Sequence, residues 1–327
     1  MKVSEFNLII KDANYFIKNI KNEIHKVVIG QEEIIDKILI AVISGGHVLL
    51  EGMPGLAKTL LLSNLAQIMD LSFNRIQFTP DLLPADLTGT LIYDHIKQNF
   101  IPKKGPIFAN FILADEINRA PAKVQSALLE AMQEKQVTIG DISYKLPEPF
   151  FVMATQNPIE HEGTYKLPEA QLDRFMFLIK INYPSITEEK EILKLYSSNI
   201  TNKLNKVVNL ETLLKARYLI KDIFIDDKII DFILEIVDST RNPFKYQLKE
   251  IENYIEYGAS PRASINISLA AKANAFISDR GYVIPEDVLK VVYDILRHRI
   301  GLTYEAELEN ITTDLIIENI LKKIYVP

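Results

Sequence analysis

The chain contains no cysteine and carries no excess of positive charge. Without cysteine, disulfide bonds, thiolate zinc sites and cysteine nucleophiles are all excluded. Lysine and arginine together number 37 and aspartate and glutamate 43, which gives a formal net charge of −6. Because no broad basic field is available to attract phosphate groups, the charge argues against nucleic acid as a partner.

Long apolar runs are missing as well. No stretch reaches the roughly 18 apolar residues that are needed to cross a bilayer, so we expect no membrane insertion. The N-terminal sequence lacks the basic start and long apolar stretch of a secretory signal. Hydrophobic residues make up 48% of the 327 positions, which is enough for the core of one large or two ordinary domains. We therefore expect a globular, cytoplasmic protein.

What the chain does contain is an alternation of short apolar runs with helical patterns, from about residue 47 to 182. Runs that are apolar at consecutive positions are typical of strands covered on both faces, as in a parallel sheet. The predicted strands are 47–50, 73–77, 111–114, 151–155 and 176–181. Residues 4–45 have helical apolar spacing, and residues 122–134 repeat apolar side chains at i, i+3, i+4 and i+7, which predicts a helix.

Two predicted hairpins interrupt this alternation of strands and helices, and the C-terminal part of the chain does not show it. Residues 136–146 surround a Gly140-Asp141 turn with β-branched residues, which predicts a hairpin, and a second hairpin is predicted around 94–98. Beyond Pro184 the spacing is helical throughout, with few glycines. The predicted fold class is therefore α/β, with a parallel-sheet domain at 1–184 and a smaller all-α domain at 185–327.

One motif dominates the chemistry, the sequence G-M-P-G-L-A-K-T between an apolar strand and an apolar helix start. Backbone N–H groups of such a turn can surround a phosphate, and the helix N-terminus adds a partial positive charge. Lys58 can reach the β- and γ-phosphates of a nucleotide, and the Thr59 hydroxyl can bind Mg²⁺. The glycine that usually precedes the lysine is replaced by Ala57. The expected nucleotide-binding residues of this turn are Gly52, Pro54, Gly55, Leu56, Ala57, Lys58, Thr59 and Leu60.

A second motif is the apolar strand that ends in Asp115 and Glu116. Strand C-termini of a parallel sheet open onto the ligand crevice beside the phosphate loop. Asp115 is then a candidate Mg²⁺ ligand, and Glu116 a candidate to polarise the water that attacks the γ-phosphate. The alternative is a strand that simply ends in two solvated acids.

A third strand ends in the sequence A-T-Q-N-P. The Asn157 amide could bond both the attacking water and the γ-phosphate from the end of a central strand. Asparagine before proline is also a routine turn former, and this alternative stays open.

Taken together, these motifs resemble an AAA+ ATPase of the MoxR branch, in the helix-2-insert clade. The resemblance covers about residues 24 to 300. The segments that carry it are L-E-G-M-P-G-L-A-K-T, Q-F-T-P-D-L-L-P-A-D-L-T-G (77–89), A-D-E-I-N-R-A-P (114–121), A-T-Q-N-P (154–158), L-P-E-A-Q-L-D-R-F (167–175) and G-A-S-P-R-A (258–263). Alanine at position 57 is common in this branch.

The resemblance implies further roles for single residues. Asn157 would be the first sensor, and Arg174 the arginine finger that reaches the γ-phosphate in a neighbouring subunit. The alternative for Arg174 is an ion pair with Asp173 or Glu169. Arg262 would be the second sensor, carried by the lid domain. Ile29 and Gly30 would line the adenine pocket.

The setting of Arg262 can also be read from the residues themselves. Ser260 can cap a helix and Pro261 suits its first position, which puts Arg262 in the first turn. A cation there opposes the helix dipole, so we expect a compensating anion, either a phosphate or Glu286. Arg119 comes shortly after the acid pair Asp115 and Glu116. It could be a subunit-interface residue or an ordinary surface charge, and we assign it no catalytic role. The five histidines are scattered, which argues against a metal site built on them.

The resemblance implies a Mg²⁺-dependent ATPase that binds ATP and ADP and forms a homo-oligomer, most simply a hexameric ring. Hydrolysis would remodel or mature a client protein complex, with von Willebrand factor A-domain partners or metal insertion as possible settings. The two hairpins would face the ring pore or the client. The alternatives are a ring motor that acts on DNA and a scaffold that binds ATP without hydrolysing it.

Overall fold

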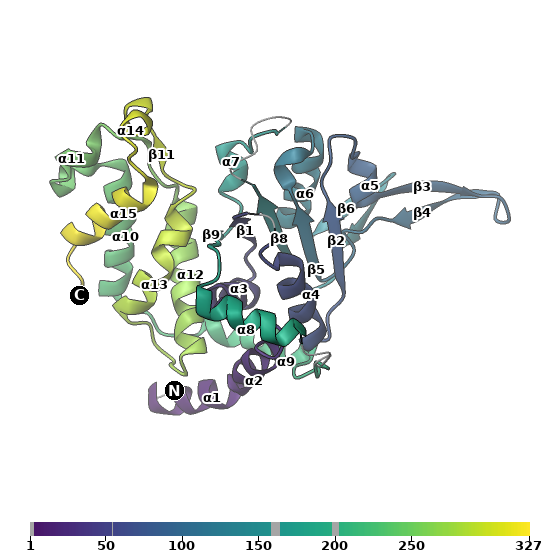
Figure 1. Ribbon diagram of the computed structural model, residues 1–327, viewed down its shortest axis with the longest axis horizontal. Helices are drawn as coiled ribbons and strands as arrows, with labels where there is room; N and C mark the ends of the chain where they lie inside the picture. Colours follow the sequence, from purple (N-terminus) through teal and green to yellow (C-terminus); the bar gives the residue numbers. More distant parts are fainter. Residues whose placement is uncertain (1–2, 54, 158–163, 198–202) are drawn as a thin grey trace. The chain divides into compact units, whose positions relative to one another are not determined.

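The computed structural model describes residues 3–53, 55–157, 164–197 and 203–327, which pack into two compact units (Figure 1). An α/β unit contains residues 16–175 and 179–214, and a helical unit combines the segment up to Tyr15 with 176–178 and 215–327. The two units interleave along the chain. The domain boundary predicted between residues 184 and 185 stays a prediction.

A five-stranded sheet forms the core of the α/β unit, in the order β2-β5-β8-β1-β9. Parallel pairing joins β2 to β5, β5 to β8 and β8 to β1, as the consecutive apolar runs predict. The strands are β1 (Val48–Glu51), β2 (Phe73–Gln77), β5 (Phe111–Asp115), β8 (Phe151–Gln156) and β9 (Phe177–Lys180). Each predicted strand is confirmed to within one residue at either end.

The helices of the α/β unit flank this sheet, and α4 packs on β2 and β5. They are α2 (Tyr15–Ile24), α3 (Glu32–Ser44), α4 (Lys58–Ile68), α5 (Pro84–Thr88), η1 (Ile117–Arg119), α6 (Ala122–Glu134), α7 (Glu169–Leu172) and α8 (Ile186–Ser197), while α9 (Leu210–Lys221) continues into the helical unit. The helix predicted at 122–134 is confirmed with the same bounds. The helical prediction for residues 4–45 is confirmed by α2, α3 and the preceding α1 (Val3–Ala13).

The register of the strands aligns their carboxyl ends. Gln77 lies opposite Asp115 across the β2–β5 pair, and Leu50 lies opposite Thr155 across the β1–β8 pair. Residues at or just after these positions therefore meet at one edge of the sheet.

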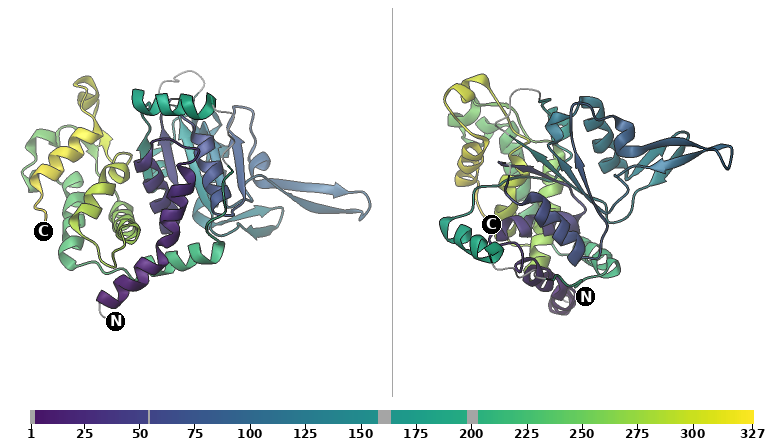
Figure 2. Two further views of the ribbon diagram at one scale, coloured as in Figure 1. Left: turned by 60° about the horizontal axis from the view of Figure 1, so that its bottom comes forward. Right: turned by 45° about the vertical axis from the view of Figure 1, so that its right-hand side comes forward.

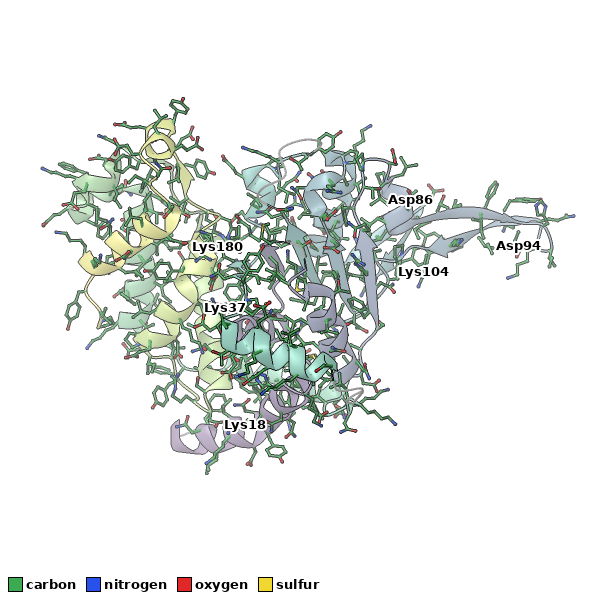
Figure 3. The ribbon with its side chains drawn as sticks, viewed as in Figure 1. Lys18, Lys37, Asp86, Asp94, Lys104 and Lys180 are labelled. Atoms are coloured by element: carbon green, nitrogen blue, oxygen red, sulfur yellow. The ribbon has the colours of Figure 1, made fainter. Side chains whose placement is uncertain are left out.

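Both predicted hairpins are confirmed. Strands β3 (Gly89–Asp94) and β4 (Asn99–Lys104) form a long one that projects from the sheet in both views of Figure 2, and β6 (Gln136–Ile139) and β7 (Ile142–Lys145) form a short one. Asp94 accepts hydrogen bonds from two backbone N–H groups of the long turn (Figure 3). At the other end of this hairpin, Lys104 lies 5.5 Å from the Tyr144 ring of β7. The two hairpins are therefore in contact.

The helical unit is built around α12 and α13, with α10 against α12. Its elements are α1, α10 (Asp227–Arg241), η2 (Pro243–Tyr246), α11 (Lys249–Glu252), α12 (Pro261–Ile277), α13 (Pro285–Leu296), α14 (Tyr304–Leu308) and α15 (Thr313–Lys323). Helix α1 attaches through Asn14, whose amide donates to Asp279 at 2.8 Å.

The structure of this unit differs from the predicted one at one place. Strands β10 (Ile255–Tyr257) and β11 (Gly301–Leu302) form a short antiparallel pair inside a region predicted to be helical throughout. A Cβ on Gly301 would lie 2.0 Å from the Tyr257 ring, so the pairing depends on glycine at this position. Such short strands leave too little periodicity to be recognised in the sequence.

Within the described ranges, no helix is both long enough and apolar enough to span a membrane.

Candidate active site

The loop between β1 and α4 has the backbone that its glycines predict. Gly55 has φ +85, in the left-handed region that glycine occupies without strain. Gly52 is needed for another reason, because a Cβ there would lie 2.8 Å from the carbonyl oxygen of Ile181. Ala57 also adopts a left-handed conformation, with φ 55, where alanine is strained by about 1–2 kcal/mol. The usual glycine at that position is therefore explained by backbone geometry. Pro54 lies outside the described residues.

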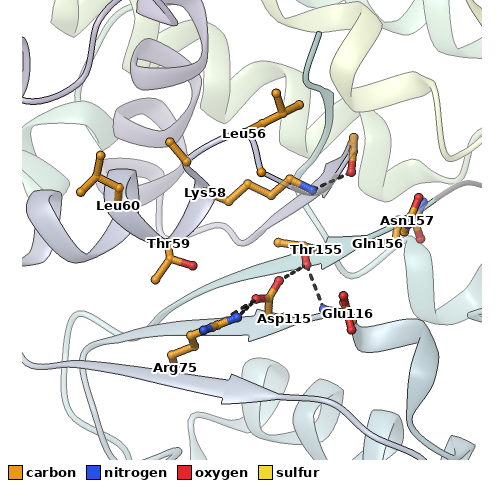
Figure 4. A pocket seen from close by; sticks show the side chains of 13 residues that line it. Leu56, Lys58, Thr59, Leu60, Arg75, Asp115, Glu116, Thr155, Gln156 and Asn157 are labelled. Atoms are coloured by element: carbon orange, nitrogen blue, oxygen red, sulfur yellow. Dashed lines mark hydrogen bonds and ion pairs between the residues drawn. The ribbon is translucent and has the colours of Figure 1, made fainter. Parts of the chain in front are cut away.

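A cavity of about 480 Å³ opens at this loop and at the carboxyl edge of the sheet (Figure 4). Its volume lies within the usual range for small-molecule sites. It is lined by Gly52, Gly55, Leu56, Ala57, Lys58, Thr59, Leu60, Arg75, Asp115, Glu116, Thr155, Gln156 and Asn157. The described residues predicted at the phosphate loop thus share one cavity with both carboxylates of the second motif and with Asn157.

Lys58 begins α4 and folds back over the loop. Its Nζ donates to the carbonyl oxygen of Gly52 at 2.7 Å. Burial lowers the pKa of the Lys58 ammonium, while the charges of Asp115 and Glu116 act in the opposite direction. An anion in the cavity would therefore be a favourable partner for this partly desolvated cation.

Both oxygens of Asp115 are engaged by neighbouring strands. Arg75 on β2 donates to Oδ2 through Nε at 3.1 Å and Nη2 at 2.6 Å. Thr155 on β8 donates its hydroxyl proton to Oδ1 at 2.7 Å and accepts from the Glu116 backbone N–H at 2.9 Å. The Thr155 hydroxyl therefore fixes the carboxylate of one acid and the backbone of the next.

Glu116 stands at the turn after β5 with φ 57, a left-handed conformation that is strained for glutamate. Its Oε2 accepts from Gln77 Nε2 at 2.8 Å and lies 3.3 Å from Arg119 Nε. The strand-end acid is therefore held within the cavity by two side chains. Arg119, which the sequence left between an interface role and a surface role, lies beside this carboxylate.

The two predicted arginines, Arg174 and Arg262, do not line the cavity. Arg174 follows α7, is half-exposed and is not among the cavity-lining residues. In the described part of the chain, no ion pair joins it to Asp173 or Glu169. Arg262 belongs to the helical unit, where its backbone N–H is capped by Ser260 and Pro261 takes the first helical position. The predicted cap and first-turn position of Arg262 are therefore confirmed, while its compensating anion and its role as a sensor stay predictions.

Ile29 and Gly30 precede α3 and are not part of the cavity lining. Gly30 has φ +67, and a Cβ there would lie 2.1 Å from the Glu188 carboxylate. The neighbouring Gln31 donates to the carbonyl oxygen of Leu56 at 3.5 Å, which connects this segment to the phosphate loop. The adenine role of Ile29 and Gly30 stays a prediction.

Four residues at the site were not predicted from the sequence: Arg75, Gln77, Thr155 and Gln156. Thr155 and Gln156 lie inside the A-T-Q-N-P motif and Gln77 begins the Q-F-T-P-D-L-L-P-A-D-L-T-G segment, so the positions of these three residues were known but not their functions. Arg75 and Gln77 alternate with apolar residues on a strand, and this polar pattern was the available signal. Its meaning depends on the register between β2 and β5, which the sequence does not reveal.

Comparison with known proteins agrees with this geometry. Residues 47–177 match the family described as "ATPase family associated with various cellular activities (AAA)", and residues 248–320 match an AAA lid domain. The chain is 45% identical to the chaperone MoxR1 of Mycobacterium tuberculosis, over 93% of this chain and 81% of that protein. It is 42% identical to the uncharacterised protein YeaC of Bacillus subtilis, over 97% of each chain.

Solved structures include a close match. A crystal structure from Cytophaga hutchinsonii, described as that of a candidate ATPase, is 53% identical and has a TM-score of 0.92. The match covers 99% of this chain and 98% of that one. The predicted fold class, an α/β AAA+ domain followed by a helical lid, is therefore confirmed.

Proposed function

Since the chain belongs to the MoxR-type AAA+ ATPases, we propose that it hydrolyses ATP in the cavity at the carboxyl edge of its sheet, with Mg²⁺ as the metal. The observation that carries this proposal is the convergence of the phosphate loop, Asp115 and Glu116 on one cavity. A triphosphate bound beside two carboxylates requires a cation between them, which favours a metal–nucleotide complex over the bare nucleotide.

The donor set suits Mg²⁺, which prefers oxygen ligands and retains several waters. Thr59 offers a hydroxyl from the first turn of α4 and Asp115 offers a carboxylate, and both line the cavity. When bound, Mg²⁺ would neutralise negative charge on the β- and γ-phosphates. In the proposed roles, Lys58 binds the same phosphates, Glu116 accepts a proton from the attacking water, and Asn157 orients that water.

Removal of Lys58 or of the metal tests the ATPase proposal. We expect Lys58→Ala and excess EDTA each to reduce ATP turnover at least about 100-fold, because each removes phosphate charge stabilisation. Lys206→Ala is the matched control, since Lys206 is exposed and pairs with Asp70 away from the cavity. Turnover that persists in Lys58→Ala, or in EDTA, would contradict the corresponding part of the proposal.

Arg174 supports a homo-oligomer, most simply a hexameric ring. The residue lies outside its own chain's cavity lining, has no ion pair with its helical neighbours in the described chain, and matches the finger position of the family. An arginine supplied by a second subunit stabilises charge in phosphoryl transfer by roughly 10³–10⁵ in rate. Mixing Arg174→Ala with Lys58→Ala subunits should restore part of the turnover that each variant lacks. No rescue at any mixing ratio would refute action between subunits.

Arg262 would sense the nucleotide from the lid, and Ile29 and Gly30 would contact the adenine of ATP or ADP. Replacement of Arg262 by alanine should lower turnover while nucleotide affinity changes only several-fold. An unchanged turnover number would contradict the sensor role.

The work done by hydrolysis is proposed to be remodelling or maturation of a client protein complex in the cytoplasm. One relative carries the name chaperone, and the long hairpin exposes apolar side chains at its far end, among them Ile96 at 94% exposure and Phe100 at 60%. We also propose that von Willebrand factor A-domain proteins act as partners and that the remodelling assists metal insertion into the client.

Capture in the Glu116→Gln background with ATP tests the client proposal. Ile96→Ser should reduce the recovered client, whereas the matched control Ile186→Ser, 88% exposed at the first position of α8 and outside both hairpins, should not. A large, salt-sensitive stimulation of turnover by DNA would instead favour a DNA motor.

A further inference from the structure

Among the described residues that line the cavity, Arg75 is the one side chain besides Lys58 that carries a positive charge. It comes from β2, a strand that contributes nothing to the three motifs of the nucleotide site. Arg75 and Gln77 are two residues apart, so their side chains leave the same face of β2. Because Gln77 is in register with Asp115, both side chains reach the end of β5 where the two acids stand.

The Arg75 guanidinium binds the carboxylate that is assigned to the metal. Its Nε and Nη2 both donate to Oδ2 of Asp115, and Thr155 occupies Oδ1 (Figure 4). The arginine therefore already balances the negative charge of Asp115 in this structure, as a bound cation would. The pair is open to water, with side-chain exposures of 50% for Arg75 and 18% for Asp115. An ion pair with this exposure can separate without unfolding the strand.

The same guanidinium sets the orientation of Gln77. Arginine has only donors, so the contact of 3.0 Å from Arg75 Nη2 must be accepted by the amide oxygen of Gln77. The amide nitrogen of Gln77 then faces Glu116 and donates to its Oε2. One arginine thereby holds Asp115 directly and Glu116 through one intervening amide.

We propose that Arg75 is a built-in counter-cation of Asp115 that competes with the metal, so that a metal–nucleotide complex forms only by displacing its guanidinium. Arg75 is then a positioning residue that raises the Mg²⁺ concentration required for nucleotide binding. Its departure also removes the contact that orients Gln77 towards Glu116. This inference rests on the Mg²⁺ site proposed above.

Binding of a fluorescent, non-hydrolysable ATP analogue, titrated with Mg²⁺, tests the proposal without depending on turnover. In Arg75→Gln the Mg²⁺ concentration at half-maximal binding should fall about two- to fivefold, the range expected for loss of an exposed ion pair. Affinity for the analogue in EDTA should stay within about twofold of the wild type. Arg75→Lys keeps the charge but loses the paired donors, so we expect a smaller shift in the same direction.

Lys206→Gln is the matched control, because it removes one exposed cation from an aspartate outside the cavity. It should leave the Mg²⁺ dependence unchanged, and thermal melting of all variants verifies that they are folded. An unchanged Mg²⁺ midpoint in folded Arg75→Gln would overturn the proposal. A higher midpoint, or weaker binding of the analogue both with and without Mg²⁺, would also overturn it, since Arg75 would then be a phosphate ligand. If binding by the wild type does not depend on Mg²⁺, the metal site itself is wrong.

Discussion

The Arg75–Asp115 pair of the α/β unit and the Arg280–Asp287 pair of the helical unit lie in different surroundings. In the α/β unit, Arg75 donates twice to one oxygen of an Asp115 side chain that is 18% exposed. In the helical unit, Arg280 donates to both oxygens of Asp287, at 2.8 and 2.6 Å, and the Asp287 side chain is 1% exposed.

The buried pair is also part of a larger network. Asp287 accepts from the Asn274 amide at 2.6 Å and from the Ile284 backbone N–H at 2.9 Å, which joins α12 to the start of α13. The hydrogen bond to Asp287 is the main reason why the pKa of Arg280 is raised. Because all acceptor positions of the Asp287 carboxylate are filled and water does not reach it, this carboxylate holds α12 and the start of α13 together. The partly exposed Asp115 carboxylate at the cavity can instead exchange one cation for another.

Removal of the buried carboxylate should have the largest effect on stability. Asp287→Ala removes the carboxylate partner of the Arg280 guanidinium and leaves the buried Asn274 amide and the Ile284 N–H without their acceptor, so we expect a loss of about 3–5 kcal/mol in the free energy of unfolding. Urea denaturation measures this loss. In the control Lys206→Ala, which removes the partner of Asp70 at a 64% exposed site, the loss should stay below about 1 kcal/mol. Equal losses in the two variants would contradict the distinction between buried and exposed pairs.

The pair at the cavity should contribute far less to stability. We expect Arg75→Gln to change the free energy of unfolding by less than about 1 kcal/mol, because exposed ion pairs are screened by water. The same urea titration without nucleotide measures it. A loss near that of Asp287→Ala would mean that Arg75 is fixed in place and cannot be displaced by a metal.

The partly exposed Asp238 carboxylate of the helical unit should make a smaller, pH-dependent contribution to the free energy of unfolding. Hydrogen bonds from Lys245, Tyr246 and Asn242 lower the pKa of Asp238 from 3.8 to about 2. A carboxyl whose pKa is lower in the folded state stabilises the protein above pH 3.8, and this contribution disappears as the pH falls through about 2. Because Asp238 is partly exposed, we expect a contribution of less than about 1 kcal/mol.

Urea midpoints between pH 2 and 5 for wild type and Asp238→Asn provide the measurement. The difference between the two proteins should shrink towards pH 2. Parallel curves over the whole interval would show that the bonds to Asp238 do not favour its charged form.

The sequence predicts best those features that repeat locally. Consecutive apolar residues identified β1, β5, β8 and β9, because a strand buried on both faces needs no alternation, whereas β2 has the mixed sequence F-N-R-I-Q. The glycines at 52 and 55 identified the phosphate loop, since one permits a close backbone approach and the other a left-handed φ.

Features that depend on partners far apart in the chain could not be predicted. The contact of Arg75 with Asp115 joins residues 40 positions apart and follows from the register of β2 on β5. The strand pair β10–β11 likewise joins two segments too short to carry a pattern. The proposed action of Arg174 likewise involves a second subunit, whose residues do not appear in the sequence pattern of one chain.

We propose that Glu116 polarises the attacking water at a site that binds Mg²⁺–ATP, and Glu116→Gln tests this role most directly. We predict that ATP turnover falls about 10²–10⁴-fold, as is usual on loss of a general base, while affinity for a non-hydrolysable ATP analogue stays within about twofold. Glu130→Gln, an exposed substitution on α6 outside the cavity lining, should leave both quantities unchanged. Turnover by Glu116→Gln that equals the wild-type rate would contradict the account.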